Sequence, residues 1–369
     1  MSNLGLIVKI LTSSLLVAGA PTSLAADPPV RRVVDVRAVG ETVPVTSDGD
    51  SADDPAIWVT AKGHAWILGT DKKAGLAVYD LEGSQVAFVP CGRVNNVDVR
   101  GGVMLDGKVG VLAAATQRDR KTVEFFWLDE ETGAISPAGH VATGLAEPYG
   151  MALGRDAAGN LSVFAGDKSG RTEQHVLGSA KDGKPQWTLA RIISMQSQSE
   201  GMICDDRTGI FYIAEESGGV WTSPITSAET TATGLELVPK DPAAATQHPL
   251  TPDVEGLAIA PSGASAGYLV VSSQGDSTFA VFQLEGSRQY VGSFRIVDGG
   301  SIDGVSETDG IELVTTPITS KYPRGLLVVQ DGSNLASDLK SPQGQNFKYI
   351  SWADVESALG LASQTGVKP

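Results

Sequence analysis

The chain has 369 residues, 41% of them hydrophobic and 19% charged, which is typical of a globular protein with a substantial buried core. Its formal net charge of −15 argues against binding to nucleic acid, because a phosphate backbone requires a basic protein surface. An anionic substrate would need local basic side chains or bound cations, because the chain as a whole would repel it.

The start of the chain has the pattern of a signal peptide. Two apolar runs, residues 4–8 and 11–20, end at the small residues 23–26, which match a cleavage site. The stretch is shorter than a membrane-spanning helix, and no later segment approaches that length. We therefore expect residues 1–26 to be removed, leaving residues 27–369 as a single domain that is periplasmic or secreted and not bound to a membrane.

A motif recurs six times in the remaining chain: an acidic or amide-bearing turn leads directly into a short apolar strand. The motifs recur roughly every 40 to 55 residues, a period typical of propeller blades. They begin at Asp53, Asn95, Glu147, Glu200, Asp253 and Asp309.

Two more apolar strands, separated by a short polar turn, follow each motif. The expected pairs are residues 65–70 and 75–81, 110–116 and 123–128, 161–166 and 173–177, 210–215 and 219–224, 268–274 and 278–284, and 326–330 and 346–352. The pattern predicts an all-β fold, a six-bladed β-propeller with four-stranded antiparallel blades around a central channel. A β-sandwich is the alternative fold, but it does not predict one acidic turn in each repeat.

The segments before and after the six repeats have predicted structures of their own. Residues 33–45 are expected to supply a strand that closes it, and residues 352–361 are the best candidate for an amphipathic helix.

The acidic turns predict a metal site. If each turn opens the innermost strand of a blade, the six turns converge on one rim of the channel. Repulsion and burial oppose such a gathering of carboxylates unless a cation offsets their charge. Oxygen ligands from loops suit calcium better than zinc or copper. Further acidic or amide candidates near these turns are Glu41, Asp50, Asp54, Glu215, Glu216, Glu255, Asp303, Asp331 and Asn334.

Basic side chains recur at one place in the repeat, just after the second strand. They are Lys72 and Lys73, Arg118, and Lys168. Beside a calcium ring, they would form a pocket that binds phosphate oxygens, which would explain how an acidic protein holds an anionic substrate.

Other catalytic chemistries have little support in the sequence. Cys91 and Cys204 lie in different predicted blades and lack metal-site or CxxC spacing, and whether they form a disulfide stays open. The four histidines are scattered singly, and there is no Gly-x-Ser-x-Gly motif.

Together these motifs resemble the β-propeller phytases. The resemblance covers residues 50–352. The segments that show it are residues 53–58, 72–76, 95–98, 200–202, 213–216, 253–257, 272–275, 308–311 and 329–332.

The resemblance implies a calcium-dependent phosphomonoesterase, a 3-phytase that hydrolyses phytate (myo-inositol hexakisphosphate) to lower inositol phosphates and phosphate. Several calcium ions, structural and catalytic, would be bound, and a metal-bound water would attack phosphorus. We expect a monomer whose partner is this small-molecule substrate.

The resemblance also assigns site residues. Calcium ions in the active site would be held by Asp53, Glu200, Glu216, Glu255 and Asp303, and the wider metal set includes Asn96, Asp253, Gln274 and Asp309. A tighter, structural calcium would be held by Asp54, the carbonyl groups of Pro55 and Val97, Asp331 and Asn334. Substrate phosphates would contact Lys72, Lys73, Arg118, Tyr149 and Lys168, and the catalytic set is Lys72, Arg118, Tyr149, Lys168 and Glu200. Arg120 is an alternative to Arg118.

Two other functions stay open at this point. A six-bladed calcium-dependent lactonase or gluconolactonase would explain the acidic ring but not Lys72, Lys73, Arg118 and Lys168. A non-catalytic binding propeller of the cell envelope would need neither the acids nor the cations at the rim.

Overall fold

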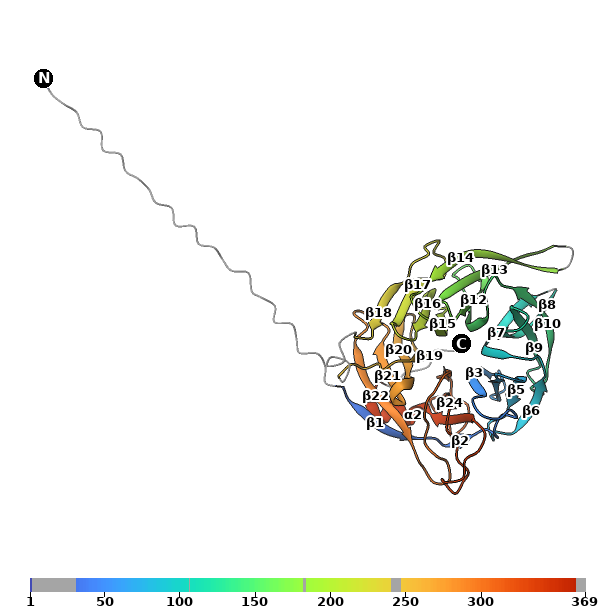
Figure 1. The fold of residues 1–369 in the computed structure, drawn as a ribbon, viewed down its shortest axis with the longest axis vertical. Helices are drawn as coiled ribbons and strands as arrows, with labels where there is room; N and C mark the ends of the chain where they lie inside the picture. Colours follow the sequence, from blue (N-terminus) through green and yellow to red (C-terminus); the bar gives the residue numbers. More distant parts are fainter. Residues whose placement is uncertain (2–30, 106, 182–183, 240–246, 363–369) are drawn as a thin grey trace. The chain divides into compact units, whose positions relative to one another are not determined.

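A computed structural model describes Met1 and residues 31–105, 107–181, 184–239 and 247–362. Its strands form six sheets that follow one another around a ring, so the predicted six-bladed β-propeller is confirmed (Figure 1). The predicted signal peptide lies outside the described residues, apart from Met1. No helix in the described part of the chain is long and apolar enough to cross a membrane.

The first four blades are each built from four consecutive strands. Blade 1 contains β3 (Ala52–Val59), β4 (Ala65–Asp71), β5 (Gly75–Tyr79) and β6 (Gln85–Val89). Blade 2 contains β7 (Val94–Leu105), β8 (Lys108–Gln117), β9 (Thr122–Leu128) and β10 (Ile135–Ala142). Blade 3 contains β11 (Pro148–Arg155), β12 (Leu161–Asp167), β13 (Arg171–Lys181) and β14 (Lys184–Ser194). Blade 4 contains β15 (Ser199–Asp205), β16 (Ile210–Glu215), β17 (Gly219–Pro224) and β18 (Thr233–Leu237).

The last two blades both use a strand from the N-terminal part of the chain. Blade 5 contains β19 (Val254–Ser262), β20 (Ala266–Ser273), β21 (Thr278–Gln283) and β22 (Tyr290–Val297), to which β1 (Val33–Arg37) adds in parallel; the short helix η1 (Gln274–Asp276) joins β20 to β21. Blade 6 contains β23 (Ile311–Val314), β24 (Leu326–Asp331) and β25 (Asn346–Ser351), and its outermost strand is β2 (Gly40–Glu41).

The ring therefore closes as predicted, through residues near Glu41. The backbone N–H of Thr42 donates to the Phe347 carbonyl at 2.9 Å, and that of Val39 donates to the Tyr349 carbonyl at 2.8 Å. These bonds satisfy the outer edge of β25, which would otherwise be exposed to pairing with another chain. The extra parallel strand on blade 5 was not predicted.

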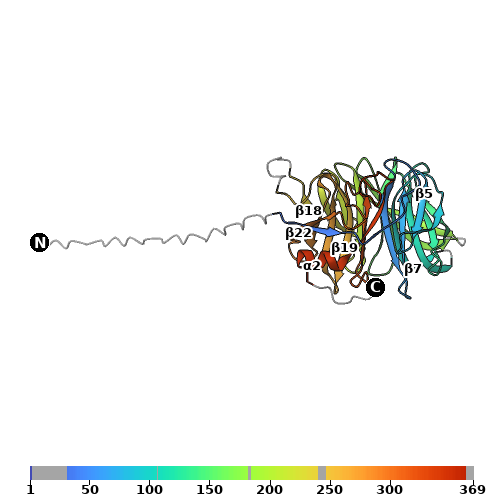
Figure 2. The same cartoon turned by 90° about the horizontal axis from the view of Figure 1, so that it is seen from below.

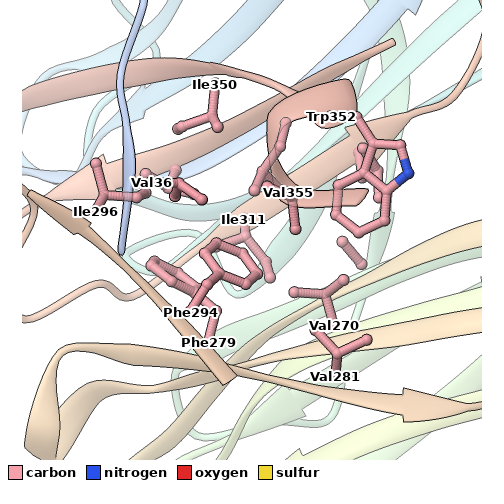
Figure 3. Close-up of a cluster of buried hydrophobic side chains, with 14 of the residues drawn as sticks. Val36, Val270, Phe279, Val281, Phe294, Ile296, Ile311, Ile350, Trp352 and Val355 are labelled. Atoms are coloured by element: carbon pink, nitrogen blue, oxygen red, sulfur yellow. The ribbon is translucent and has the colours of Figure 1, made fainter. Parts of the chain in front are cut away.

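The joint between blades 5 and 6 is covered by the one helix that was predicted, α2 (Trp352–Leu359). Trp352 and Val355 are fully buried against a cluster that includes Phe279, Phe294 and Ile311 (Figure 3). Each buried aromatic or aliphatic side chain of this kind stabilises the fold by roughly 1.5–3 kcal/mol. Seen from the side, α2 lies beneath β22 (Figure 2).

The innermost strands share a feature that places the site. In five blades the first strand has a register shift near its start, at Ala52/Pro55, Val94/Val97, Pro148/Met151, Ser199/Met202 and Val254/Leu257. A β-bulge leaves residues out of the ladder and changes the direction of their side chains. The first strands are also those nearest the channel axis (Figure 1). Each bulge can therefore direct a side chain into the channel.

Candidate metal and phosphate site

A cavity of about 520 Å³ lies at the end of the channel where the inner strands begin. Among its lining residues, Lys72 is the single cation that the described part of the chain contributes. The lining carboxylates are Asp50, Glu200, Glu216, Asp253, Glu255, Glu307 and Asp309. The cavity is therefore strongly acidic, as the turn motif predicted.

One residue from the start of each inner strand faces this end of the channel. These six residues are Asp53, Asn95, Tyr149, Glu200, Glu255 and Asp309. Asn95 Nδ2 donates to Glu200 Oε1 at 2.7 Å, which shows how closely neighbouring blades approach here. The expected ring of six acidic groups is thus a ring of four carboxylates, an amide and a phenol.

Glu147 differs from the prediction. It does not line the cavity, and its carboxylate accepts hydrogen bonds from Arg118 Nε at 2.8 Å and Arg93 Nη2 at 2.9 Å. The residue that reaches the cavity from this blade is Tyr149, because the bulge of blade 3 falls two residues after Glu147.

Glycines after the ring residues let the inner strands approach one another. A Cβ atom added to Gly201 would lie 2.1 Å from the Glu255 carbonyl oxygen, and one added to Gly310 would lie 2.8 Å from the Asp53 carbonyl oxygen. The Gly310 N–H donates to that same Asp53 oxygen at 3.0 Å. The acid–glycine pairs at Glu200, Glu255 and Asp309 are therefore the sequence signal for the ring.

Lys72 is buried among three of the carboxylates. Its Nζ lies 2.8 Å from Asp50 Oδ1, 3.1 Å from Asp53 Oδ1 and 2.7 Å from Asp309 Oδ2. Burial acts to lower the pKa of Lys72, but Asp53, Asp309 and Glu200 together hold it above its usual range. Lys72 is therefore an ammonium ion that offsets part of the acidic charge.

Three carboxylate oxygens at the ring have no hydrogen-bond partner among the residues that the structure describes. Asp53 is fully buried, and neither of its carboxylate oxygens accepts a hydrogen bond from any described residue; the same is true of Glu255 Oε2. Unsatisfied buried carboxylate oxygens are costly and call for a cation. One oxygen each of Glu200, Glu216 and Glu255 also lies within 4.8 Å of the others, a spacing that calcium–oxygen bonds of about 2.4 Å can bridge. These residues fit a calcium ion.

The raised pKa values of the carboxyl groups at the ring also indicate a functional site. Burial, then the charges of Asp53 and Asp309, raises the pKa of Glu200 well above its usual value. Burial, then the charge of Asp53, raises the pKa of Asp309 to about 7, and burial, then the charge of Asp253, raises that of Glu216 to about 7. Clustered shifts of this size are typical of functional sites.

Basic side chains border the cavity beside Tyr149. The guanidinium carbon of Arg118 lies 5.0 Å, and Lys168 Nζ 4.4 Å, from the centre of the Tyr149 ring. Arg120 is directed elsewhere, with Nη2 3.2 Å from the Cys91 carbonyl oxygen. The structure thus brings Arg118, Lys168 and Tyr149 together with Lys72, whereas the Lys73 ammonium donates to the carbonyl of Asp48.

The predicted structural calcium site is divided in two. Asp54, Pro55, Asn96 and Val97 line a second cavity, of about 320 Å³, and Asp54 Oδ2 accepts a hydrogen bond from the Val97 N–H at 2.9 Å. Burial raises the pKa of Asp54 well above its usual value.

The remaining predicted calcium ligands do not line this second cavity. Asp303, Asp331 and Asn334 lie around the ammonium group of Lys348 instead. Asp303 is thereby separated from Glu200, Glu216 and Glu255. The metal roles of all these residues stay predictions.

Sequence reasoning missed several polar residues of the main cavity. Gln198, Glu307, Gln330 and Gln345 line it, and the Gln330 side-chain oxygen accepts the Asp309 N–H at 2.9 Å. Gln274, which was predicted, donates to Asp309 Oδ1 at 2.5 Å. Gln198, Glu307 and Gln345 lie in loops with no repeated motif, and Gln330 lies on β24.

Comparisons with known proteins give one consistent result. A family model described as phytase matches residues 5–367. The 3-phytase of Bacillus subtilis (strain 168) is 37% identical over 336 residues, which cover 88% of this chain and 85% of the relative. Among solved structures, a luciferin-regenerating enzyme superimposes with a TM-score of 0.51 over 84% of this chain and 95% of its own, at 11% identity, a likeness of fold alone.

Proposed function

The chain belongs to the phytase family, and from that premise we propose that it hydrolyses phytate to lower inositol phosphates and phosphate in a calcium-dependent reaction. The main support is the pairing of two opposite features at one channel end. Buried carboxylate oxygens of Asp53 and Glu255, which accept no hydrogen bond from the described residues, lie there near the basic side chains of Lys72, Arg118 and Lys168.

The metal would be held by the oxygens of the main cavity. The residues available are Asp53, Glu200, Glu216, Asp253, Glu255, Gln274 and Asp309. Calcium, when bound, supplies positive charge that offsets both the carboxylates and the substrate phosphates and makes nearby water more acidic. Asp54, Asn96 and the carbonyl groups of Pro55 and Val97 would hold a structural ion in the second cavity.

The chain's own basic residues would hold and stabilise phosphate. Arg118 is oriented by Glu147, because Arg118 Nε donates to the Glu147 carboxylate at 2.8 Å and Arg118 Nη2 lies 2.7 Å from the same oxygen, so little side-chain freedom is lost when a phosphate binds. Lys72 and Lys168 add positive charge, which is most valuable where negative charge develops on the transferring phosphoryl group.

Tyr149 would donate a hydrogen bond to the same phosphate. Burial, then the charges of Glu200 and Asp53, raises the pKa of Tyr149 above its usual range. The phenol therefore keeps its proton at neutral pH and can act only as a donor toward an anionic oxygen.

We also propose that the chain works as a monomer outside the cytoplasm, periplasmic or secreted. The apolar run at residues 4–20 supports export. Millimolar calcium, which extracellular calcium modules use, would suffice there.

One assay tests the proposal against the lactonase and binding-propeller alternatives. Phosphate release from phytate is measured with calcium, with a chelator, and with calcium restored, beside hydrolysis of a lactone. We expect release with calcium, loss with the chelator, recovery on adding calcium back, and no lactone turnover. Lactone hydrolysis without phosphate release would support the lactonase, and no turnover of either compound would support the binding propeller.

A further inference from the structure

A buried hydroxyl group joins blades 2 and 3 next to Tyr149. It belongs to Thr116 on β8, which is fully buried. Thr116 Oγ1 donates a hydrogen bond to the Tyr149 carbonyl oxygen at 2.7 Å and accepts one from the Asn96 N–H at 3.1 Å. Tyr149 lines the main cavity and Asn96 lines the second one, so a single hydroxyl group connects the backbone at both cavities.

The bulge of blade 3 explains why Tyr149 needs this bond. Tyr149 lies inside the register shift between Pro148 and Met151, so its backbone is outside the regular ladder between β11 and β12. A buried carbonyl group without a hydrogen bond is costly. The residue of β12 opposite the bulge is Gly166, which has no side chain that could supply a donor.

In blades 1 and 2 the bulge is bonded by a residue of the same blade. A threonine lies opposite each of these bulges, Thr70 on β4 and Thr116 on β8. Thr70 Oγ1 accepts the Asp54 N–H at 2.9 Å, just as Thr116 Oγ1 accepts the Asn96 N–H. The bulge of blade 3, which has no such threonine, is bonded by the hydroxyl group of the neighbouring blade instead.

A bond of the same kind links blades 5 and 6. Ser272 on β20 lies opposite the bulge of blade 5, and its Oγ donates to the Thr308 carbonyl oxygen at 2.8 Å. Thr308 directly precedes the ring residue Asp309. Both bonds between blades therefore end on the backbone at a ring residue or immediately before one, which indicates that they fix the ring.

We propose that Thr116 is a positioning residue for phosphate binding, which acts by fixing the backbone of Tyr149. The inference rests on the proposed function, in which the Tyr149 phenol donates to a substrate phosphate. The Tyr149 ring lies between Arg118 and Lys168, so a shift of its backbone would move the phenol relative to both cations. Small displacements of a group that contacts the reacting phosphate lower the rate strongly.

Removing the hydroxyl group alone tests the proposal. Thr116→Val keeps the shape of the side chain but leaves the Tyr149 carbonyl and the Asn96 N–H without this partner. At saturating calcium we expect kcat/KM for phytate to fall by about ten- to 100-fold. Thr116→Ser keeps the hydroxyl group, so its kcat/KM should stay within about three-fold of the parent value.

A buried hydroxyl group elsewhere in blade 3 provides the control. Ser162 Oγ, near the end of β12 that is remote from Tyr149, accepts a hydrogen bond from Gln174 Nε2 at 3.0 Å. Ser162→Ala should lower the melting temperature and leave kcat/KM for phytate unchanged. Equal losses of kcat/KM in Ser162→Ala and Thr116→Val would show a general effect of stability and would overturn the proposal.

A double-mutant cycle shows whether Thr116 acts through Tyr149. In a Tyr149→Phe background, which lacks the phenol hydroxyl group, Thr116→Val should cause little further loss of kcat/KM. Additive losses would overturn the proposal, because Thr116 would then act through another group. Thr116→Val without effect beside an impaired Tyr149→Phe would refute the inference alone, whereas Tyr149→Phe without effect would refute the proposed role of Tyr149 as well.

Two further measurements keep the test decisive if Thr116→Val does not fold or if the parent chain releases no phosphate. Thr116→Cys offers a thiol, a weaker donor and acceptor of similar size, so kcat/KM should fall by an intermediate amount; a parent value would overturn the proposal. Crystal structures of these variants do not depend on turnover and should show Tyr149 displaced. An unmoved Tyr149 would overturn the proposal whatever the reaction.

Discussion

At the scale of single residues, two equally buried carboxylates meet different surroundings. Asp303 faces the Lys348 ammonium and a backbone N–H, so both of its oxygens are satisfied. Asp53 has only the Lys72 ammonium at 3.1 Å, and its oxygens accept no hydrogen bond from the described residues. Because a buried carboxylate is stable only when it is compensated, Asp53 is the residue that calls for an external cation.

The two candidate arginines, Arg118 and Arg120, allow a test of phosphate binding in which one variant is the control for the other. Arg118→Gln should lower kcat/KM for phytate by about 10- to 100-fold, because a hydrogen bond to a charged group contributes about 1.5–3 kcal/mol. Arg120→Gln should stay within about two-fold, since Arg120 faces the Cys91 carbonyl rather than the cavity. Steady-state kinetics of both variants decide between the two arginines. A larger loss in Arg120→Gln would reverse the assignment.

The raised pKa values predict how calcium binding depends on pH. Asp309 and Glu216 have pKa values of about 7, above the value of about 4 in an unfolded chain. Between these values the calcium-free fold binds more protons than the unfolded chain, so its stability falls as the pH rises through this window. Calcium must displace those protons, so its affinity should rise from about pH 6 to about pH 8 and then level off. Calorimetric titrations in two buffers of different ionisation enthalpy should show proton release near pH 7; equal affinities without proton release would contradict this account.

At the scale of elements, the bulge near the start of the inner strand in blades 1 to 5 directs a ring residue into the channel. In blade 6, whose inner strand has no such register shift, the glycine after the ring residue Asp309 allows the neighbouring strand to approach. A side chain at Gly310 would meet Asp54 Oδ1 at 2.1 Å. Gly310→Ala should therefore destabilise the protein by about 1–3 kcal/mol, as overpacking of a tight contact does.

A glycine whose surroundings leave room for a Cβ atom provides the control for this substitution. A Cβ atom on Gly178 of β13 would meet its nearest neighbour, the Gln186 carbonyl oxygen, at 3.4 Å. Gly178→Ala should leave the free energy of unfolding in urea unchanged within about 0.5 kcal/mol. Equal effects of the two substitutions would show that the close approach at Gly310 does not matter for stability.

The elements that sequence predicts well are those with a strong local pattern. The second and third strands of each blade, such as β8 and β9, are apolar and nearly continuous, and their predicted positions agree with the structure. The outermost strands, such as β6, are half exposed and lack that pattern. The bulges were not predicted either, because a bulge leaves the apolar alternation of a short strand almost unchanged.

The candidate site, like the strands, was predicted from the sequence only where its residues follow the repeat. The ring acids and the basic residues after the second strands were found because they recur at fixed places in the repeat. The contact between Lys348 and Glu41 could not be found in this way, since the two residues are 307 positions apart. Only the closing of the ring brings the two residues together.

At the scale of the whole molecule, a chain of net charge −15 gathers carboxylates at the end of its channel and still has to bind a polyanion. Lys72, Arg118 and Lys168 are too few to reverse the charge of the ring. The proposed calcium ions resolve this conflict, because they offset the ring and the substrate at the same place.

The calcium dependence of phosphate release tests this central claim most directly. Phosphate release from phytate is measured across a calcium titration for the parent chain, for Glu255→Gln, and for Glu131→Gln, an exposed acid on the blade 2 turn. The calcium concentration at half-maximal rate should rise at least about ten-fold in Glu255→Gln and stay unchanged in Glu131→Gln. Three superimposed curves, or release that needs no calcium, would contradict the account.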